Sequence, residues 1–530
     1  MNDHTPLHHA ARNGQTSAVE RLLTSGASIE AMDKDRNTPL HLAVWKSHTD
    51  VVELLLDKGA SIQAFNKYRN TALHLAAWSG HSGMAELLLR NGASVRARNR
   101  YGNTPLHLAA LKGHAGMAEL LLEKAALIEA GNKELNTPLH LAAVSGSASA
   151  VRLLLKKGAS IDARGSCNFT PLHCAAQSGH TGTVELLLNE GASVGAMGFY
   201  DFTPLHCAAQ NGQIGVAKQL LDKGVSIEAL DTSLHPAAGN GHSCLVELLL
   251  VKGASIEAMN KYKHYSTPLH RAVSGGHTGV VELLLSKGAS INAMDDYNLT
   301  PLHYAADCGH TGMAGLLLER GASIEAVNKG YGTPLHTAAI AGRARVVELL
   351  LEKGASTEAI NQNNNSPIHV AATTDVLEVF LGKGASIEAL TEDNNTPLHT
   401  AAMLGRTWVM EFLLEKGASI EAMNKDNSTP LHLAAWDGRI NVLELLLKKG
   451  ASIEAINKDG YTPLHLAAWK NLTWIDYTDT VALLLTKGAS IEAMDKYGNT
   501  PLDIAVRRDN TGAVKLLKKA AKSAVHRHSA

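Results

Sequence analysis

A short motif, Thr-Pro-Leu-His, returns along the sequence at a nearly constant distance. It occurs sixteen times, intact or nearly so; eleven of the fifteen intervals are 33 residues, and the others are 29, 35, 30 and 38. The copies begin at Thr5, Thr38, Thr71, Thr104, Thr137, Thr170, Thr203, Thr232, Thr267, Thr300, Thr333, Ser366, Thr396, Thr429, Thr462 and Thr500. In a chain of 530 residues, such a period predicts one array of stacked repeats rather than several separate cores.

Each repeat is predicted to contain two short helices and a connection, as the second repeat illustrates. Thr38 can cap a helix, and Pro39 suits its first turn. Apolar residues at 51, 52 and 54–56 predict a second helix buried on several sides, which Gly59 ends in a left-handed conformation. Residues 60–69 are too few and too polar for a third helix, so they predict a hairpin-like connection. Such a unit can bury its apolar faces only against copies of itself.

The period and the motif Thr-Pro-Leu-His-x-Ala resemble those of the ankyrin-repeat family. A Gly-His between the helices, a Val-x-Leu-Leu-Leu and a Gly-Ala-Ser-Ile-Glu-Ala segment extend the resemblance over residues 4–521. The resemblance implies an all-α repeat solenoid of helix-turn-helix pairs with hairpin-like connections, in a curved, elongated array. It also implies a non-catalytic scaffold that holds partner proteins on its concave face. Residues 522–530 are expected to form a short polar tail.

Charge, hydropathy and cysteine content narrow the range of partners and compartments. The chain has 49 basic and 50 acidic residues, and this near-neutrality argues against nucleic acid as a partner. Apolar runs are far shorter than a membrane span, and the first residues are polar, so neither a membrane segment nor a signal peptide is expected. Five scattered cysteines do not suggest a disulfide framework. We therefore expect an intracellular, cytoplasmic monomer that binds other proteins.

The 27 histidines could suggest a metal or catalytic site, but the repeat accounts for most of them. Fifteen are the motif histidine, and seven follow the glycine between the helices or its equivalent. The resemblance implies that the motif histidine forms hydrogen bonds within and between repeats. Cys174 and Cys207 share one repeat position and are expected to be small buried thiols rather than metal ligands. Because no phosphate loop or nucleophile motif appears, we expect no enzyme, catalytic residue, metal or cofactor.

Two variable repeat positions carry most of the large aromatic residues. The position after the Ala-Ala pair of the first helix holds four of the six tryptophans, in adjacent pairs. Tyrosines recur three residues before the motif threonine. The candidate partner-binding residues are therefore Trp45, Trp78, Trp436, Trp469, Tyr68, Tyr101, Tyr200, Tyr297 and Tyr497.

The resemblance places the tryptophan position on the concave groove, where Trp and Tyr are frequent interface anchors. Alternatively, the tryptophans pack on neighbouring helices, and duplication copied each pair.

Irregular repeats interrupt the array. The eighth has a connection four residues short and Pro236 inside its first helix; the ninth follows two extra residues near 261–264; the twelfth lacks three residues near Thr374. Since the stability of a solenoid is a sum over neighbours, we predict the fastest hydrogen exchange at residues 225–266. In the fifteenth repeat, five inserted residues form either a docking finger or a loop folded back on the array, around Leu472, Trp474, Ile475 and Tyr477.

A protein-interaction scaffold or adaptor is the function that these features favour. An effector that an intracellular microbe directs at host proteins would use the same binding face, so only the organism separates these two possibilities. Nucleic-acid binding and enzymatic activity are remote alternatives. Steep salt dependence of affinity for a generic duplex would reveal the first, and turnover abolished by a point change would reveal the second.

Overall fold

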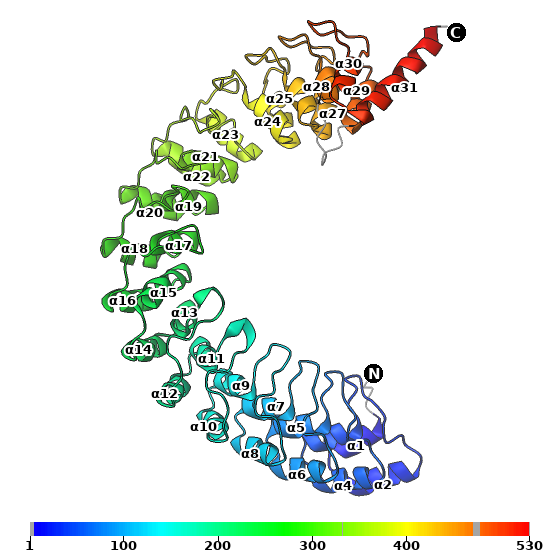
Figure 1. The fold of residues 1–530 in the computed structure, drawn as a ribbon, viewed down its shortest axis with the longest axis vertical. Helices are drawn as coiled ribbons and strands as arrows, with labels where there is room; N and C mark the ends of the chain where they lie inside the picture. The colour runs from blue at the N-terminus through cyan, green and yellow to red at the C-terminus, as the bar shows by residue number, and fades with distance from the viewer. Residues whose placement is uncertain (1–4, 331, 470–477, 529–530) are drawn as a thin grey trace. The chain divides into compact units, whose positions relative to one another are not determined.

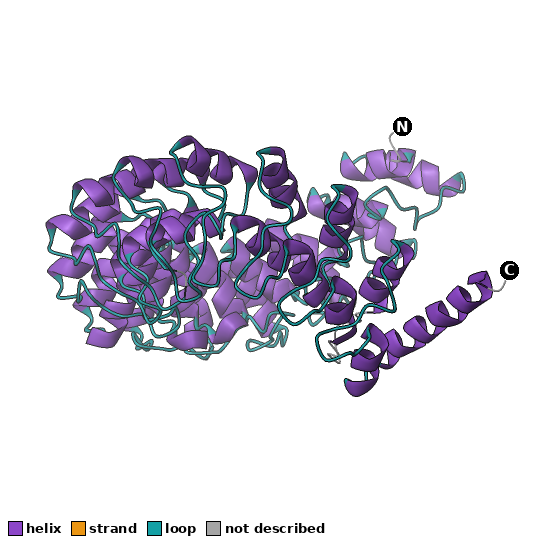
Figure 2. Cartoon of the chain, turned by 90° about the horizontal axis from the view of Figure 1, so that it is seen from above, coloured by secondary structure: helices purple, strands orange, loops and turns teal. Residues whose placement is uncertain are grey.

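The computed structural model describes residues 5–330, 332–469 and 478–528. These residues form 31 α-helices, most of them seven to nine residues long, and contain no strand (Figure 2). The predicted all-α repeat fold is therefore confirmed. No helix within the described ranges is both long enough and apolar enough to span a membrane. The chain divides into two compact units, Met1–Lys263 with Gly279–Ala289 and His264–Thr278 with Ser290–Ala530.

In the first unit, the first helices of successive repeats stack in one row and the second helices in another (Figure 1). The first helices are α1 (Pro6–Arg12), α3 (Pro39–Trp45), α5 (Ala72–Ser79), α7 (Pro105–Lys112), α9 (Pro138–Ser145), α11 (Pro171–Ser178), α13 (Pro204–Gln210) and α15 (Ile227–Gly239). The second helices are α2 (Thr16–Thr24), α4 (Thr49–Asp57), α6 (Ser82–Arg90), α8 (Ala115–Glu123), α10 (Ala148–Lys156), α12 (Thr181–Asn189), α14 (Ile214–Asp222), α16 (Ser243–Val251) and α18 (Thr278–Ser286). Two 3-10 turns lie in connections, η1 (Ser166–Asn168) and η2 (Phe199–Asp201).

The second unit repeats this two-row arrangement. Its first helices are α17 (Pro268–Ser274), α19 (Pro301–Cys308), α21 (Pro334–Ile340), α24 (Pro397–Leu404), α26 (Pro430–Trp436), α28 (Pro463–Trp469) and α30 (Pro501–Arg507). Its second helices are α20 (Thr311–Glu319), α22 (Ala344–Glu352), α23 (Thr374–Gly382), α25 (Thr407–Glu415), α27 (Ile440–Lys448), α29 (Thr478–Thr486) and α31 (Thr511–His528).

The core lies between the helices of each repeat and between neighbouring repeats. In the third repeat, Leu73, Ala76 and Ala77 of α5 and Ala85 and Leu88 of α6 are completely buried. Small alanines on the first helix allow the neighbouring helices to approach closely, and leucines fill the remaining space. The invariant positions of the repeat therefore form the core, whereas the variable positions lie outside it.

The motif threonine and histidine tie each repeat to the next. In the third repeat, the amide and hydroxyl of Thr71 lie 3.2 and 2.9 Å from His74 Nδ1. Because a backbone N–H can only donate, Nδ1 accepts, and the Nε2–H donates to the carbonyl of Asn103 at 3.0 Å. Burial lowers the pKa of His74 to about 4, so the ring is neutral.

The same bond to a carbonyl 29 residues ahead recurs in both units. It is formed by His8, His41, His107, His140, His173, His270, His303, His336, His399 and His432. The structural role that the family resemblance implied for these histidines is therefore confirmed.

Histidines after the inter-helix glycine bond in the opposite direction along the array. His48 Nε2 lies 2.9 Å from the carbonyl of Arg12, and His114 Nε2 lies 3.1 Å from that of Trp78. Arg343, at the same repeat position, donates from Nε to the carbonyl of Asp307 at 2.8 Å. In these three repeats, the side chain at this position forms a hydrogen bond to a carbonyl near the end of the preceding first helix.

The eighth repeat does not begin its helix at Thr232 as the motif predicts. Helix α15 begins at Ile227, with the Ser226 hydroxyl accepting from the amide of Ala229 at 3.2 Å. The connection is four residues short, so the segment that elsewhere makes a turn forms the first turn of this helix instead. Thr232 and Pro236 consequently lie inside the helix.

The twelfth repeat lacks its first helix. Residues 367–370 form turns, and α23 begins directly after Thr373, whose hydroxyl accepts from the amide of Val376 at 3.4 Å. The sequence showed where residues are missing, but it did not predict the loss of the helix. With three residues missing, the segment is too short for both a helix and the turn that must follow it.

The last helix continues to His528, so most of the predicted polar tail is helical. Ala521 stands where earlier repeats have the glycine that ends the second helix, such as Gly59 with its φ of 90°. Alanine favours helix continuation over that left-handed conformation. The insertion around Leu472, Trp474, Ile475 and Tyr477, expected to be either a docking finger or a loop folded back on the array, lies outside the described residues.

Candidate functional site

Side chains from the second to fourth repeats line a groove of about 490 Å³ in the first unit. Its apolar lining comes from three repeat positions: leucines of the first helices, residues at the ends of those helices and tyrosines of the connections. These residues are Leu42, Leu75, Leu108, Leu111, Trp45, Trp78, Tyr68 and Tyr101. Four of the nine predicted binding residues thus come together, and we call this site the aromatic groove.

Hydrogen bonds between neighbouring connections hold the tyrosines of the aromatic groove in place. The amide of Arg100 donates to the carbonyl of Tyr68 at 2.8 Å. The side-chain amide of Asn99 donates to Asn70 Oδ1 at 2.9 Å, and the same pair of bonds recurs in the adjacent repeats. Because these hydrogen bonds already order the connections, binding of a ligand in the groove would require less free energy for ordering the protein.

The tryptophans of the aromatic groove are open to solvent. Trp45 is 46% exposed and Trp78 is 41% exposed, and no ring of the described residues stacks on either. Lysine ammonium groups lie nearby: Lys46 Nζ is 5.2 Å from the Trp45 ring centre, and Lys112 Nζ is 3.8 Å from that of Trp78. Large rings with solvent-facing surface are the usual anchors of protein interfaces.

The second predicted pair, Trp436 and Trp469, is half-buried in the second unit. The two ring centres lie 6.4 Å apart, and Tyr461 meets Trp469 edge to face at 5.6 Å. The guanidinium carbon of Arg508 lies 3.8 Å from the Trp469 ring centre. These four residues, which we call the tryptophan cluster, adopt the arrangement of the alternative interpretation, in which tryptophans pack on neighbouring repeats.

The remaining predicted tyrosines are exposed but do not line the aromatic groove. Tyr200 meets Tyr262 edge to face at 6.0 Å. Tyr297 meets the His264 ring at 5.0 Å, and Tyr497 lies on the connection before the last repeat. The structure therefore separates these three residues from the four that line the groove.

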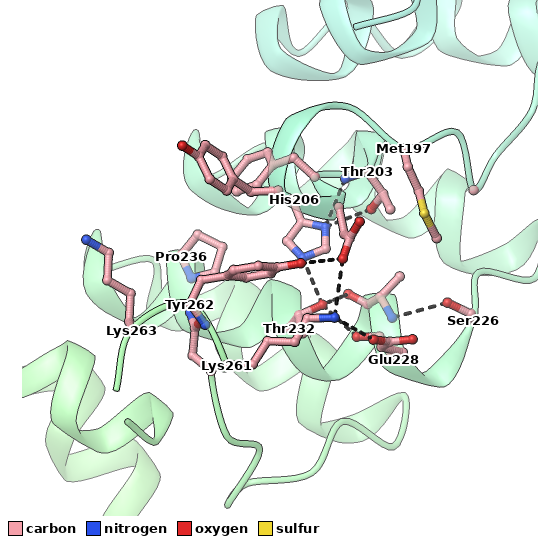
Figure 3. Close-up of a pocket in the computed structure, with 16 residues that line it drawn as sticks. Met197, Thr203, His206, Ser226, Glu228, Thr232, Pro236, Lys261, Tyr262 and Lys263 are labelled. Atoms are coloured by element: carbon pink, nitrogen blue, oxygen red, sulfur yellow. Dashed lines mark hydrogen bonds and ion pairs between the residues drawn. The ribbon is translucent and has the colours of Figure 1, made fainter. Parts of the chain in front are cut away.

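A larger pocket, of about 730 Å³, lies in the first unit where the connection before α15 is short (Figure 3). The next connection reaches across it: Lys261 Nζ lies 3.2 Å from Asp201 and 3.5 Å from Glu228, and the Tyr262 hydroxyl donates to Asp201. These hydrogen bonds, from Tyr262 first and then Lys261, lower the pKa of Asp201. Figure 3 shows Lys263 pointing away from this group. We call this site the bridged gap, because neighbouring residues span the missing part of the connection.

Models of ankyrin repeats match nearly the whole chain. The model described as ankyrin repeats (3 copies) matches residues 1–66, 73–165, 161–231, 234–328, 324–391, 373–457, 422–495 and 452–526, and that described as ankyrin repeats (many copies) matches residues 46–89. The chain belongs to the ankyrin-repeat family. No curated protein matches it. Ankyrin repeats are generally protein–protein interaction modules and are typically non-catalytic.

The buried histidine of the bridged gap and two buried cysteines have structural rather than chemical roles in this ankyrin array. In the bridged gap, His206 Nδ1 accepts from Thr203 and Nε2 donates to the Thr232 hydroxyl at 2.8 Å, so neither nitrogen is available as a base. Burial lowers the pKa of His206 to about 4 and raises the pKa of Cys174 and of Cys207 to about 12. The expected burial of both thiols is confirmed. In the part of the chain that the structure describes, no three His, Cys, Asp or Glu side chains converge on a possible metal position.

The sequence did not single out the residues that complete the two aromatic sites. The groove leucines Leu42, Leu75 and Leu108 recur at one repeat position and resemble ordinary core residues. Tyr461 directly precedes the motif threonine, where the groove repeats have asparagine, such as Asn70. A ring at this position, eight residues before a tryptophan, was a signal that the tryptophan could be covered.

Proposed function

We propose that this ankyrin-repeat protein is an intracellular adaptor that binds partner proteins through the aromatic groove. The observation that carries the proposal is the pair of solvent-open tryptophans, Trp45 and Trp78, above a leucine-lined floor. A partner side chain placed there would displace water from apolar surface on several sides.

The frame around the groove supports the same proposal. Tyr68 and Tyr101 stand on connections that are already joined by backbone and asparagine hydrogen bonds. Tyr and Trp also have few rotatable bonds, so they supply contact area at a low cost in conformational entropy. The rings of the tryptophan cluster are less available, because Tyr461 and Trp436 already contact Trp469.

Affinity capture from the native cell, at matched expression of the full chain, tests the proposal. Trp45→Ala/Trp78→Ala is expected to lose the partners that the unchanged protein retains. Trp436→Ala/Trp469→Ala serves as the matched control, because it removes the same residue types from the same repeat position, and it is expected to retain them. The opposite pattern, or retention of every partner by both variants, would overturn the proposal.

A further inference from the structure

Cationic side chains surround the aromatic groove. Lys46 and Lys112 lie over the two tryptophan rings, and Lys67 Nζ lies 5.0 Å from the Tyr68 ring centre. Three ammonium groups therefore stand on three of the four aromatic rings that line this site. Their position places the ends of the lysine side chains beside any ligand that contacts the rings.

The carboxylates near the groove do not balance this charge. Asp35 is the one acidic residue among the described residues that line the groove, and it forms an ion pair with Lys67. Lys46 and Lys112 have no carboxylate partner within the described part of the chain. The groove thus combines an apolar floor with two uncompensated positive charges.

Two asparagine side chains add further donors. The Oδ1 atoms of Asn70 and Asn103 accept the bonds of the asparagine ladder, from Asn99 and Asn132. Both asparagines line the groove, and their Nδ2 groups have no acceptor among residues 5–330, 332–469 and 478–528. A ligand rich in oxygen acceptors would satisfy both these amides and the lysines.

We propose that the partner segment is an acidic, extended peptide that places a bulky apolar side chain on the groove floor and carboxylates beside Lys46 and Lys112. The inference rests on the proposed function, because it assigns the chemistry of the ligand at the same site. The site spans three repeats, or about 20 Å at the usual spacing of packed helices. An extended segment of about six residues covers that length.

The probe is a library of random peptides displayed on phage, selected on the full-length protein and counter-selected on Trp45→Ala/Trp78→Ala. Peptides that require the two tryptophans are expected to carry an excess of Asp and Glu around an apolar anchor. Tryptophan-dependent peptides that are neutral or basic would overturn this inference and leave the proposed function standing. Failure to obtain any tryptophan-dependent peptide would overturn both.

Charge reversal of the two unpaired lysines provides the second arm of the test. For the strongest peptide selected, hereafter the groove peptide, Lys46→Glu/Lys112→Glu is expected to weaken binding about tenfold and to reduce its salt dependence. Lys58→Glu/Lys156→Glu is the matched control, because these exposed lysines, one directly after α4 and one at the end of α10, change the net charge equally but lie outside the groove. Equal losses for the two double variants would show a general charge effect and contradict the inference.

Discussion

The aromatic groove and the tryptophan cluster place the same residue at the same position of the repeat, yet only the groove leaves its rings open. In the groove, the residue before the motif threonine of the third repeat is Asn70, which bonds to the neighbouring connection. In the cluster, the equivalent residue is Tyr461, whose ring meets Trp469 at 5.6 Å. The side chain beside the tryptophan is therefore one difference between the available surface and the covered one.

The cationic side chains beside the tryptophans, in contrast, do not distinguish the two regions. Lys112 and Arg508 occupy equivalent repeat positions, and each lies 3.8 Å from the ring centre of a tryptophan in the preceding repeat. This contact is therefore common to both sites and does not determine whether the pair is open. The ring of Tyr461 and the contact between Trp436 and Trp469 are the features specific to the cluster.

Low pH should lower the stability of both regions, because both contain buried motif histidines that are neutral in the folded protein. The pKa of His41, His74, His107 and His399 is lowered from 6.5 to about 4, first by desolvation. Their contribution to stability is therefore complete above 6.5 and is lost as the pH falls toward 4. At about pH 5, each such histidine is expected to cost about 2 kcal/mol of unfolding free energy. Urea unfolding at a series of pH values, followed by tryptophan fluorescence, measures this loss of stability. A loss of stability confined to one of the two regions would contradict a common role for the buried histidines.

Removing the two tryptophan pairs should affect different properties. Trp45→Ala/Trp78→Ala is expected to weaken binding of the groove peptide about 100-fold or more, because both rings are interface anchors. Trp436→Ala/Trp469→Ala should change that affinity less than about twofold, but should lower the unfolding free energy by about 2 kcal/mol through lost packing. Fluorescence anisotropy and urea unfolding measure the two effects. Equal effects on binding would remove the distinction between the regions.

Exchanging the distinguishing residue should convert the groove toward the cluster. Asn70→Tyr is expected to weaken binding of the groove peptide about tenfold, because the new ring occupies apolar surface that the peptide needs. Asn70→Ala removes the ladder bond without adding a ring, and isothermal titration should find a much smaller loss. If Asn70→Ala were as damaging as Asn70→Tyr, the ladder rather than the ring would determine the difference.

The reverse exchange should open the cluster. Tyr461→Asn is expected to lower stability by about 1 kcal/mol, because it removes an edge-to-face aromatic contact. Collisional quenching of Trp469 by acrylamide should increase. An unchanged quenching constant would show that Tyr461 does not cover the tryptophan.

The segment that contains the short connection and the bridge across it should be the least protected against hydrogen exchange. We expect the fastest hydrogen exchange at residues 225–266, with a further small increase in Tyr262→Phe, which removes the exposed hydrogen bond to Asp201 at a cost below about 1 kcal/mol. Mass spectrometry of exchanged peptides measures both effects. Uniform protection through this stretch would discard the idea of a weak joint.

The sequence predicted what recurs in every repeat and failed where a neighbour from another repeat decides the outcome. Thr71, His74 and Gly80 follow from local propensities, and the same residue types recur at these positions in most repeats. Two features depend instead on how a segment with missing residues spans the fixed distance between neighbouring repeats. These features are the start of α15 at Ile227 and the missing first helix before α23. The covering of Trp469 depends on Tyr461 and on contact with Trp436, which lies one repeat away, so the identity of the tryptophan alone could not reveal it.

Collisional quenching of each tryptophan pair by itself tests the central claim most directly. Two proteins are needed, one that retains only Trp45 and Trp78 and one that retains only Trp436 and Trp469, with every other tryptophan changed to Phe. The first is expected to be quenched more strongly by acrylamide and to become protected when the groove peptide is added, while the second is unaffected. Equal quenching of the two proteins, or protection of Trp436 and Trp469 by the peptide, would contradict the account.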